Sequence, residues 1–280
     1  MTLAPAARLI AEARDAGTGI GAFNVVHLET AEALVAASES AGLPVILQIS
    51  QNCAEYHGGL APIGLATLAL AGAAATPVAV HLDHAERPEL VDEAIGLGFG
   101  SVMFDGGALP YDENVRLTAQ VVERAHAADV YVEGELGEVG GKDGAHAPGM
   151  RTDPAEALAF VRETGVDALA VAVGSSHAMQ QRTAALDLAR IAELRSTLDV
   201  PLVLHGSSGV PDESLEAAVR TGMTKINVST HLNGFFTRAV RDALAAQPDV
   251  VDSRKYLRAG RAAIVPEAAR LLRLFALRTA

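Results

Sequence analysis

The chain has 280 residues, and half of them are hydrophobic, which is enough for the core of one large α/β domain. A formal net charge of −12 argues against non-specific nucleic-acid binding, because neutralising phosphates requires clustered Lys and Arg. The single cysteine, Cys53, excludes an internal disulfide and is typical of a reducing compartment. The first residues show no signal-peptide pattern, so we expect a cytoplasmic protein.

Residues 58–80 carry no charge, so a membrane span is one alternative for this segment. A span needs about 20 strongly apolar residues. Here Pro62, Pro77 and several glycines interrupt a stretch that is largely alanine. We therefore predict a buried helix followed by a strand, and no association with a membrane.

Eight short apolar segments, each predicted to be a strand, alternate with helical patterns after a leading helix over residues 4–16. The predicted strands cover residues 19–25, 44–50, 77–84, 100–105, 130–136, 168–174, 201–206 and 223–228. The helices that follow them cover residues 28–41, 62–75, 88–97, 114–128, 154–164, 187–198, 211–221 and 232–246.

Regular alternation of strands and helices predicts a parallel sheet, and a count of eight predicts an α/β fold of the closed (β/α)8 TIM-barrel type. An open doubly wound sheet is the alternative, but no GxGxxG motif opens a helix after the first strand. We expect a single domain over residues 1–280, with the barrel at about 18–247 and a C-terminal helical tail at about 248–280.

Polar and ionisable side chains gather where the predicted strands end, whereas glycine and proline mark the strand starts. The strand-end residues are Asn24, Gln48, Ser50, His81, Asp83, His84, Asp105, Glu133, Glu135, His177, His205, Asn227, Ser229 and Thr230. The active site of a (β/α)8 barrel is built at the C-terminal ends of its strands. The sequence therefore predicts a site at this end of the barrel.

Three histidines follow different predicted strands: His84, His177 and His205. Three imidazoles that converge from separate strands suit a zinc ion with one open position, although each histidine alone is more often structural. Asp83, beside them, could accept a proton, or could simply cap the next helix. His81 is predicted to orient a ligand, and the remaining histidines are predicted to be solvated: His27, His57, His126, His146 and His231.

Two segments that open helices could bind phosphate through backbone N–H groups and hydroxyls. One is residues 205–211 and the other is residues 227–230, which follow the seventh and eighth predicted strands. Barrel enzymes often bind phosphate at these two loops. Ordinary helix capping by serine and threonine explains each segment equally well, and Gly174 could add a further backbone contact.

Seven motifs occur in one order along the chain: AFN at residues 22–24, HLDH at 81–84, VMFDG at 102–106, EGELG at 133–137, GSSH at 174–177, LHGSSG at 204–209 and KINV at 225–228. Together they resemble the class II, zinc-dependent fructose-bisphosphate and tagatose-bisphosphate aldolases. The resemblance runs from about residue 5 to about residue 261.

The resemblance implies reversible cleavage of a ketose 1,6-bisphosphate, with fructose 1,6-bisphosphate expected, to dihydroxyacetone phosphate and glyceraldehyde 3-phosphate. It implies that His84, His177 and His205 hold the zinc and that Asp83 is the acid/base on the C4 hydroxyl. Asp105 and Glu135 match a second or alternate metal site. Substrate-binding positions would be Asn24, Ser50, Gly174, Ala178, Gly206, Ser207, Ser208, Asn227, Val228, Ser229 and Thr230, and some members also bind Na⁺ or K⁺ there.

Three positions depart from the pattern of the family. Asp143, in the glycine-rich loop 138–144, stands where members usually carry the glutamate that protonates the enediolate. Ala178 replaces a glycine beside the phosphate pocket. Ser229 replaces an aspartate or alanine, which leaves the stereochemistry of the sugar open, so a tagatose-bisphosphate or another dihydroxyacetone-phosphate-dependent aldolase is the alternative.

Two other classes of protein compete with this assignment. A Schiff-base aldolase would need a buried lysine, for which Lys225 is the candidate. A non-catalytic sugar-phosphate-binding barrel would not need Asp83 together with three histidines, so the presence of these residues argues against that class.

Residues 253–261 form the densest basic cluster in the chain. A solvated helix start explains such a cluster. The resemblance instead implies a homodimer or homotetramer in which one of Arg254, Arg258 and Arg261, with Arg258 taken as the candidate, reaches the distal phosphate in the other subunit's site.

Overall fold

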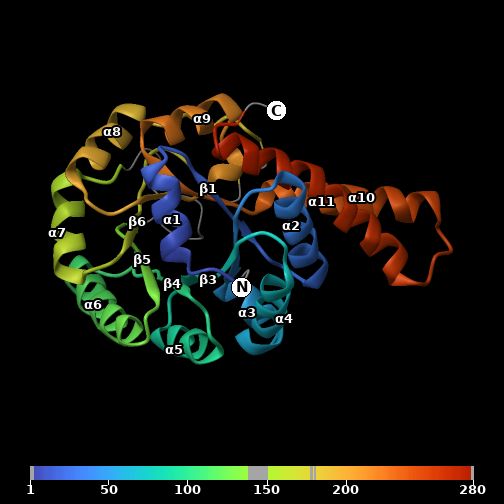
Figure 1. Ribbon diagram of the computed structural model, residues 1–280, viewed down its shortest axis with the longest axis horizontal. Coiled ribbons are helices and arrows are strands. Elements are labelled where there is room, and N and C mark those ends of the chain that lie inside the picture. The colour runs from blue at the N-terminus through green and yellow to red at the C-terminus, as the bar shows by residue number, and fades with distance from the viewer. Residues whose placement is uncertain (1–2, 138–150, 177–178, 180, 279–280) are drawn as a thin grey trace.

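The computed structural model describes residues 3–137, 151–176, 179 and 181–278 (Figure 1). Asp143, His146, His177 and Ala178 lie outside the described residues, so their predicted roles stay predictions. None of the described helices is long and apolar enough to cross a membrane.

Eight parallel strands close into a barrel in which each strand pairs with its neighbours in the sequence and β8 pairs with β1. The strands are β1 (Ile20–Asn24), β2 (Val45–Ser50), β3 (Val78–Ala85), β4 (Ser101–Phe104), β5 (Tyr131–Glu135), β6 (Ala168–Ala170), β7 (Leu202–Leu204) and β8 (Met223–Val228). The predicted TIM barrel is confirmed, and the open doubly wound sheet is wrong.

Helices surround the barrel and cover its strands on the outside (Figure 1). They are α1 (Ala6–Asp15), α2 (Leu28–Ala41), α3 (Gln51–Tyr56), α4 (Leu60–Ala73), α5 (Pro88–Leu97), α6 (Tyr111–Ala127), α7 (Pro154–Thr164), α8 (Leu188–Thr197), η1 (Ser207–Gly209), α9 (Asp212–Thr221), α10 (Thr230–Ala246) and α11 (Ser253–Phe275).

The helix boundaries follow from local chemistry, as α7 illustrates. Asp153 caps its first turn by accepting N–H bonds from Ala155 at 2.9 Å and Glu156 at 3.0 Å, and Pro154 suits the first helical position. Gly165 ends the helix in the left-handed conformation that glycine adopts without penalty.

Two features of the fold differ from the sequence expectation. The helix predicted over residues 62–75 is preceded by a separate short helix, α3, which Ser50 caps by accepting the N–H of Cys53 at 3.3 Å. Strand pairing in β6 and β7 also ends earlier than predicted. Beyond β6, the backbone of Ala172 bonds to Thr152 instead of to a neighbouring strand.

The N-terminal end of the barrel is closed by apolar packing. Leu9 and Ile10 of α1 are buried against inward-facing side chains of the first strands, including Ile20 and Ile46. The buried ionisable side chains lie instead toward the opposite end of the strands.

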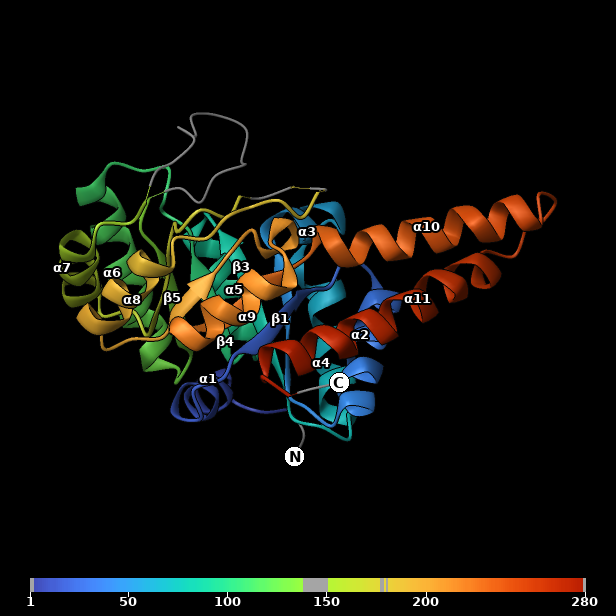
Figure 2. The same cartoon turned by 90° about the horizontal axis from the view of Figure 1, so that it is seen from above.

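The C-terminal half of α10 (Thr230–Ala246), residues 247–252 and the N-terminal half of α11 (Ser253–Phe275) form a hairpin that projects from the barrel, and we call it the arm (Figure 2). The second half of α11 returns to the barrel, where Ile264, Leu272 and Phe275 are buried. Phe275 packs against Phe23 of β1, with the ring centroids 6.3 Å apart. The first part of the predicted C-terminal helical tail thus projects from the barrel, and the second part packs in the core.

Candidate active site

Asp83 and His84 are consecutive residues at the end of β3, yet both face the same site. Successive side chains of a regular strand point to opposite faces. Here the pairing register between β3 and β4 shifts between Leu82 and Ala85, and His84 has a φ of 47°, a left-handed conformation that is uncommon for residues other than glycine. This local distortion turns the His84 ring toward Asp83 and the barrel axis.

Asp83 is 2% exposed and is held by amide side chains from two other strands. Asn24 donates to Oδ2 at 3.0 Å, and Asn227 donates to Oδ1 at 3.4 Å. Burial acts to raise the pKa of Asp83, but the neighbouring His84, His205 and Lys225, together with the bond from Asn24, hold it below its usual value. Asp83 is therefore an ionised carboxylate at neutral pH, which a proton acceptor requires.

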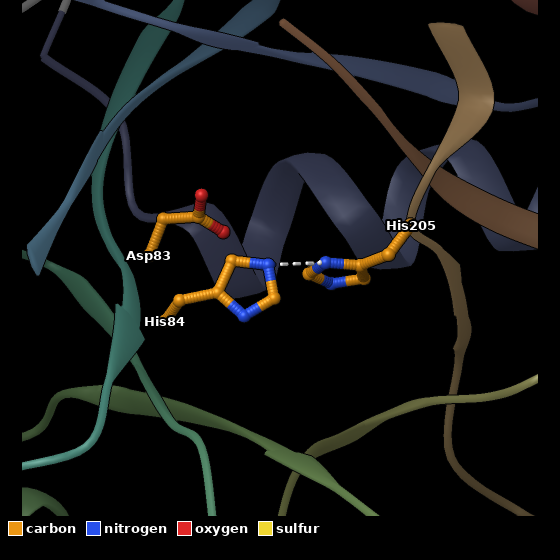
Figure 3. A group of neighbouring side chains, drawn as sticks. All are labelled: Asp83, His84 and His205. Atoms are coloured by element: carbon orange, nitrogen blue, oxygen red, sulfur yellow. Dashed lines mark hydrogen bonds between the residues drawn. The ribbon is translucent and has the colours of Figure 1, made fainter. Parts of the chain in front are cut away.

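One nitrogen of the His84 ring points toward one nitrogen of the His205 ring, with the Asp83 carboxylate beside them (Figure 3). Nε2 of His84 lies 2.9 Å from Nδ1 of His205. One possible ligand atom from each of Asp83, His84 and His205 lies within 4.8 Å of the other two. Side chains from the ends of β3 and β7 thus converge at one point.

The outer nitrogen of each ring contacts a carboxylate. Nδ1 of His84 lies 2.7 Å from Asp105, and Nε2 of His205 lies 2.9 Å from Glu133. A carboxylate that accepts from a ring nitrogen fixes the proton there, so the other nitrogen presents a lone pair. Two ring nitrogens 2.9 Å apart can share a proton, and a metal ion could take the place of that proton.

A zinc ion fits this donor set. Two nitrogens on one tetrahedral zinc stand about 3.4 Å apart, close to the separation of the facing ring nitrogens. Burial acts to lower the pKa of His84, but Asp83, Asp105 and Glu135 together raise it to about 9. Carboxylates that stabilise a positive charge on this ring also favour a metal ion beside it.

A second group of possible ligands shares His84. Asp105 and Glu135 each offer an oxygen near this ring, with Glu135 Oε2 at 3.8 Å from Nδ1. Asp105 already contacts Nδ1 of the His84 ring at 2.7 Å, so it supports the orientation of that ring.

A layer of buried polar side chains lies below the site, inside the barrel. Lys225 Nζ donates to Glu133 Oε2 at 2.7 Å and lies 3.3 Å from Nε2 of His81, whose Nδ1 contacts Ser101 at 2.7 Å. Glu133 thereby links Lys225 to His205. Because Lys225 is fully buried and paired, it is a poor candidate for a Schiff base, which requires a neutral, accessible amine.

We expect Lys225→Met to destabilise the fold by about 3–5 kcal/mol, because it leaves the Glu133 carboxylate buried without its cation. The double variant Lys225→Met/Glu133→Gln removes both charges and should recover most of that loss. Urea unfolding followed by circular dichroism measures both. If Lys225→Met unfolds at the wild-type urea concentration, the pair contributes nothing to stability.

The two predicted phosphate-binding segments, residues 205–211 and 227–230, meet at Ser208, and the loop after β6 approaches Gly206. The φ of Gly206 is 66°, and a Cβ there would lie 2.7 Å from the backbone of Ser176, so only glycine allows the loops after β6 and β7 to approach this closely. Ser208 Oγ accepts the N–H groups of Ser229 at 3.3 Å and His231 at 3.2 Å. A cavity of about 640 Å³ opens beside Ser208 and the start of α10.

Some predicted substrate-binding residues have structural partners. The Ser207 hydroxyl donates to the carbonyl of Leu204 at 3.1 Å, and Ser50 caps α3. Val228 is buried in β8. By contrast, Oδ1 of Asn227 is buried and has no hydrogen-bond partner among the described residues, as expected of an atom that awaits a ligand.

Sequence reasoning did not assign roles to Gln48 and Glu133. Gln48 donates to Asn24 Oδ1 at 2.8 Å and so fixes the amide that holds Asp83. Glu133 lies two residues before Glu135 and therefore on the same face of β5, which is the signal that could have identified it.

An ionised carboxylate beside converging imidazoles at the C-terminal end of a (β/α)8 barrel is typical of a metal-dependent barrel enzyme. Residues 4–278 match the family "Fructose-bisphosphate aldolase class-II". The chain belongs to the class II fructose-bisphosphate aldolase family, whose members depend on zinc.

Individual relatives align over nearly the whole chain. A fructose-bisphosphate aldolase from Geobacillus stearothermophilus is 41% identical, covering 94% of this chain and 93% of the relative. A 6-phospho-5-dehydro-2-deoxy-D-gluconate aldolase from Shouchella clausii (strain KSM-K16) is 40% identical, covering 94% and 91%. The crystal structure of the YdjI aldolase from Escherichia coli K12 matches with a TM-score of 0.85 at 30% identity, covering 98% of this chain and 97% of that one.

Proposed function

We propose that this aldolase cleaves fructose 1,6-bisphosphate to dihydroxyacetone phosphate and glyceraldehyde 3-phosphate, with zinc held by His84, His177 and His205. The observation that carries the proposal is the ionised Asp83 carboxylate beside the facing rings of His84 and His205. The name of the relative from Geobacillus stearothermophilus supports the choice of fructose 1,6-bisphosphate.

Asp83 accepts the proton of the C4 hydroxyl as the C3–C4 bond breaks and the aldehyde leaves. Zinc, when bound, supplies a Lewis acid that stabilises the negative charge developing beside the ketone. Asn24 and Asn227 hold Asp83 in position from either side. Because both amides donate to the carboxylate, they favour its ionised form until the substrate proton arrives.

The phosphate of dihydroxyacetone phosphate is proposed to bind at Gly174, Gly206, Ser208 and the start of α10, with Na⁺ or K⁺ as a possible counter-ion. Backbone N–H groups at a helix start favour an anion. Asp143 is proposed to return a proton to the enediolate carbon, and Asp105 and Glu135 to provide the alternate metal position.

A panel of ketose bisphosphates that differ at C4 tests the substrate assignment. With zinc-loaded protein, we expect fructose 1,6-bisphosphate to have a kcat/KM at least about tenfold above that of tagatose 1,6-bisphosphate, the selectivity that one well-placed hydrogen bond provides. The relative from Shouchella clausii shows that a chain about as similar carries a different aldolase name, so 6-phospho-5-dehydro-2-deoxy-D-gluconate belongs in the panel. Preference for another substrate would overturn the assignment.

The distal phosphate of the substrate is proposed to bind Arg258 of a second copy of this chain, in a cytoplasmic homodimer or homotetramer. Arg258 is exposed on α11, on the arm that projects away from its own barrel (Figure 2). An arginine can bind a phosphate through two parallel hydrogen bonds.

We expect Arg258→Ala to raise KM for fructose 1,6-bisphosphate by about tenfold, the loss of one charge-assisted contact, with little change in dihydroxyacetone phosphate binding. Arg254→Ala is the matched control, because Arg254 lies one turn earlier on the arm and pairs with Asp252. Steady-state kinetics and sedimentation measure the effect. An unchanged KM, or full activity in a monomer, would refute the role of Arg258.

A further inference from the structure

A network of charged side chains centred on Arg270 joins the three loops that meet at the proposed phosphate site. Arg270 of α11 donates to Glu267 Oε2 at 2.9 Å and Oε1 at 2.7 Å, and to Asp212 Oδ2 at 2.7 Å. Asp212 is the first residue of α9, the helix that follows η1. Arg270 therefore holds the start of α9, which follows the loop after β7, against α11.

Glu267 also contacts the start of α10. Nε2 of His231 lies 2.7 Å from Glu267 Oε1, so the same carboxylate receives both His231 and Arg270. The prediction that His231 is a solvated residue is wrong: its side chain is 18% exposed and contacts Glu267 at 2.7 Å. This contact ties the first turn of α10 to α11.

Asp212 also links Arg270 to the third loop, which is the loop after β6. Arg182, which lies after β6, donates to Asp212 Oδ1 at 2.6 Å and to the carbonyl of Val210 at 2.8 Å. We call the set Arg182, Asp212, His231, Glu267 and Arg270 the Arg270 brace. It connects the loops after β6, β7 and β8 to one helix outside the barrel.

The brace lies next to a residue proposed to bind substrate. Ser208 Oγ accepts the backbone N–H of His231, so the His231 main chain and Ser208 are held together while the His231 side chain is held by Glu267. Ser208, His231 and Arg182 all line the cavity of about 640 Å³. A movement of the brace would therefore displace the Ser208 hydroxyl and the start of α10 within this cavity.

The two carboxylates of the brace stay ionised over the working pH range. Burial acts to raise the pKa of Glu267, but Arg270 and His231 lower it to about 2. The pKa of Asp212 is also held below its usual value by its two arginines, against the effect of burial. Bidentate, charge-assisted contacts of this kind fix geometry as well as supply energy.

We propose that the Arg270 brace is a positioning network for phosphate binding, which sets Ser208 and the start of α10 without contacting the substrate's reacting atoms. The inference rests on the proposed function, since it needs a phosphate at Ser208. It assigns to α11 a role in the affinity of the site that is separate from the metal and from Asp83.

The test compares zinc-loaded wild type with Glu267→Ala, using dihydroxyacetone phosphate in calorimetry and fructose 1,6-bisphosphate in kinetics. We expect the Kd and KM to rise by about tenfold while kcat stays within twofold, because a charge-assisted contact that positions the phosphate is lost and the chemistry is untouched. Glu267→Gln keeps the shape and one acceptor oxygen, so it should fold even if Glu267→Ala does not, and should show a smaller rise in KM.

A double-mutant cycle with His231→Ala shows whether Glu267 acts through His231, since coupled residues have non-additive effects. We expect Glu267→Ala to raise KM no more than twofold further in the His231→Ala background. Arg273→Ala is the control on the same helix, because Arg273 reaches only the carbonyl of Ser40 in the described structure, and it should leave KM unchanged.

The outcomes separate the two proposals. If wild type binds dihydroxyacetone phosphate and Glu267→Ala and Glu267→Gln bind it equally well, the brace does not position the phosphate. A fall in kcat with an unchanged KM would also overturn the inference. If zinc-loaded wild type binds no dihydroxyacetone phosphate, the proposed function fails, and the inference fails with it.

Discussion

Replacing His84 or His205 with alanine is expected to remove bound zinc and to reduce aldol cleavage below detection, with the barrel intact. The facing nitrogens of these rings lie 2.9 Å apart, and each ring is oriented by a carboxylate. Each of these rings is one of only three predicted protein ligands of the zinc ion, so losing one weakens metal binding strongly. The same loss is predicted for His177→Ala.

Metal content measured by mass spectrometry, together with circular dichroism, tests this expectation. His126→Ala is the matched control, because His126 also pairs with a carboxylate, Asp167, but on the exposed surface of α6. It should retain zinc and activity. If His84→Ala or His205→Ala retains stoichiometric zinc, the assignment of these ligands is wrong.

Asp83→Ala should separate catalysis from metal binding. We expect this variant to retain zinc and to bind dihydroxyacetone phosphate, but to lose about 10²–10⁴-fold in kcat, the usual contribution of a positioned acid/base. The reason is geometric: Asp83 is held by Asn24 and Asn227 beside the facing rings, and its lowered pKa keeps it ready to accept a proton.

Asp83→Asn provides the second variant, since it keeps the size of the side chain and removes the charge. Both variants should lose turnover to a similar extent. Because Asp83 also lies among the possible ligand atoms, zinc content decides between its two roles. Loss of zinc from Asp83→Asn would make Asp83 a ligand, and a loss of activity below tenfold would require another base.

The barrel could be predicted from the sequence because eight short, largely apolar segments alternate with helical patterns, and most of their polar residues gather toward the C-terminal ends. Ser101 and Lys225, near the starts of β4 and β8, are exceptions. Site residues at regular positions near the strand ends could therefore be predicted as well. Asp83, His205 and Asn227 lie at such positions. His84 does not, since strand alternation places it opposite Asp83, and only the left-handed turn at φ 47° brings both side chains to one site.

Contacts between distant parts of the chain could not be predicted. Glu133 and Lys225 are 92 residues apart, and only the closed barrel brings them together. Helix α3 was missed because its six residues are too short to show an apolar period. The Arg270 brace joins residues from four segments, and no local pattern marks His231 or Arg270 as its members.

Cleavage of fructose 1,6-bisphosphate before and after removal of metal tests the central claim most directly. Dihydroxyacetone phosphate release would be followed in a coupled assay with purified protein, with chelator-treated protein and with that protein after zinc is restored. We predict that the chelator abolishes cleavage, that zinc restores it, and that borohydride added with dihydroxyacetone phosphate leaves Lys225 unmodified. Full cleavage by metal-free protein, or a borohydride-trapped adduct on Lys225, would contradict the zinc-dependent mechanism.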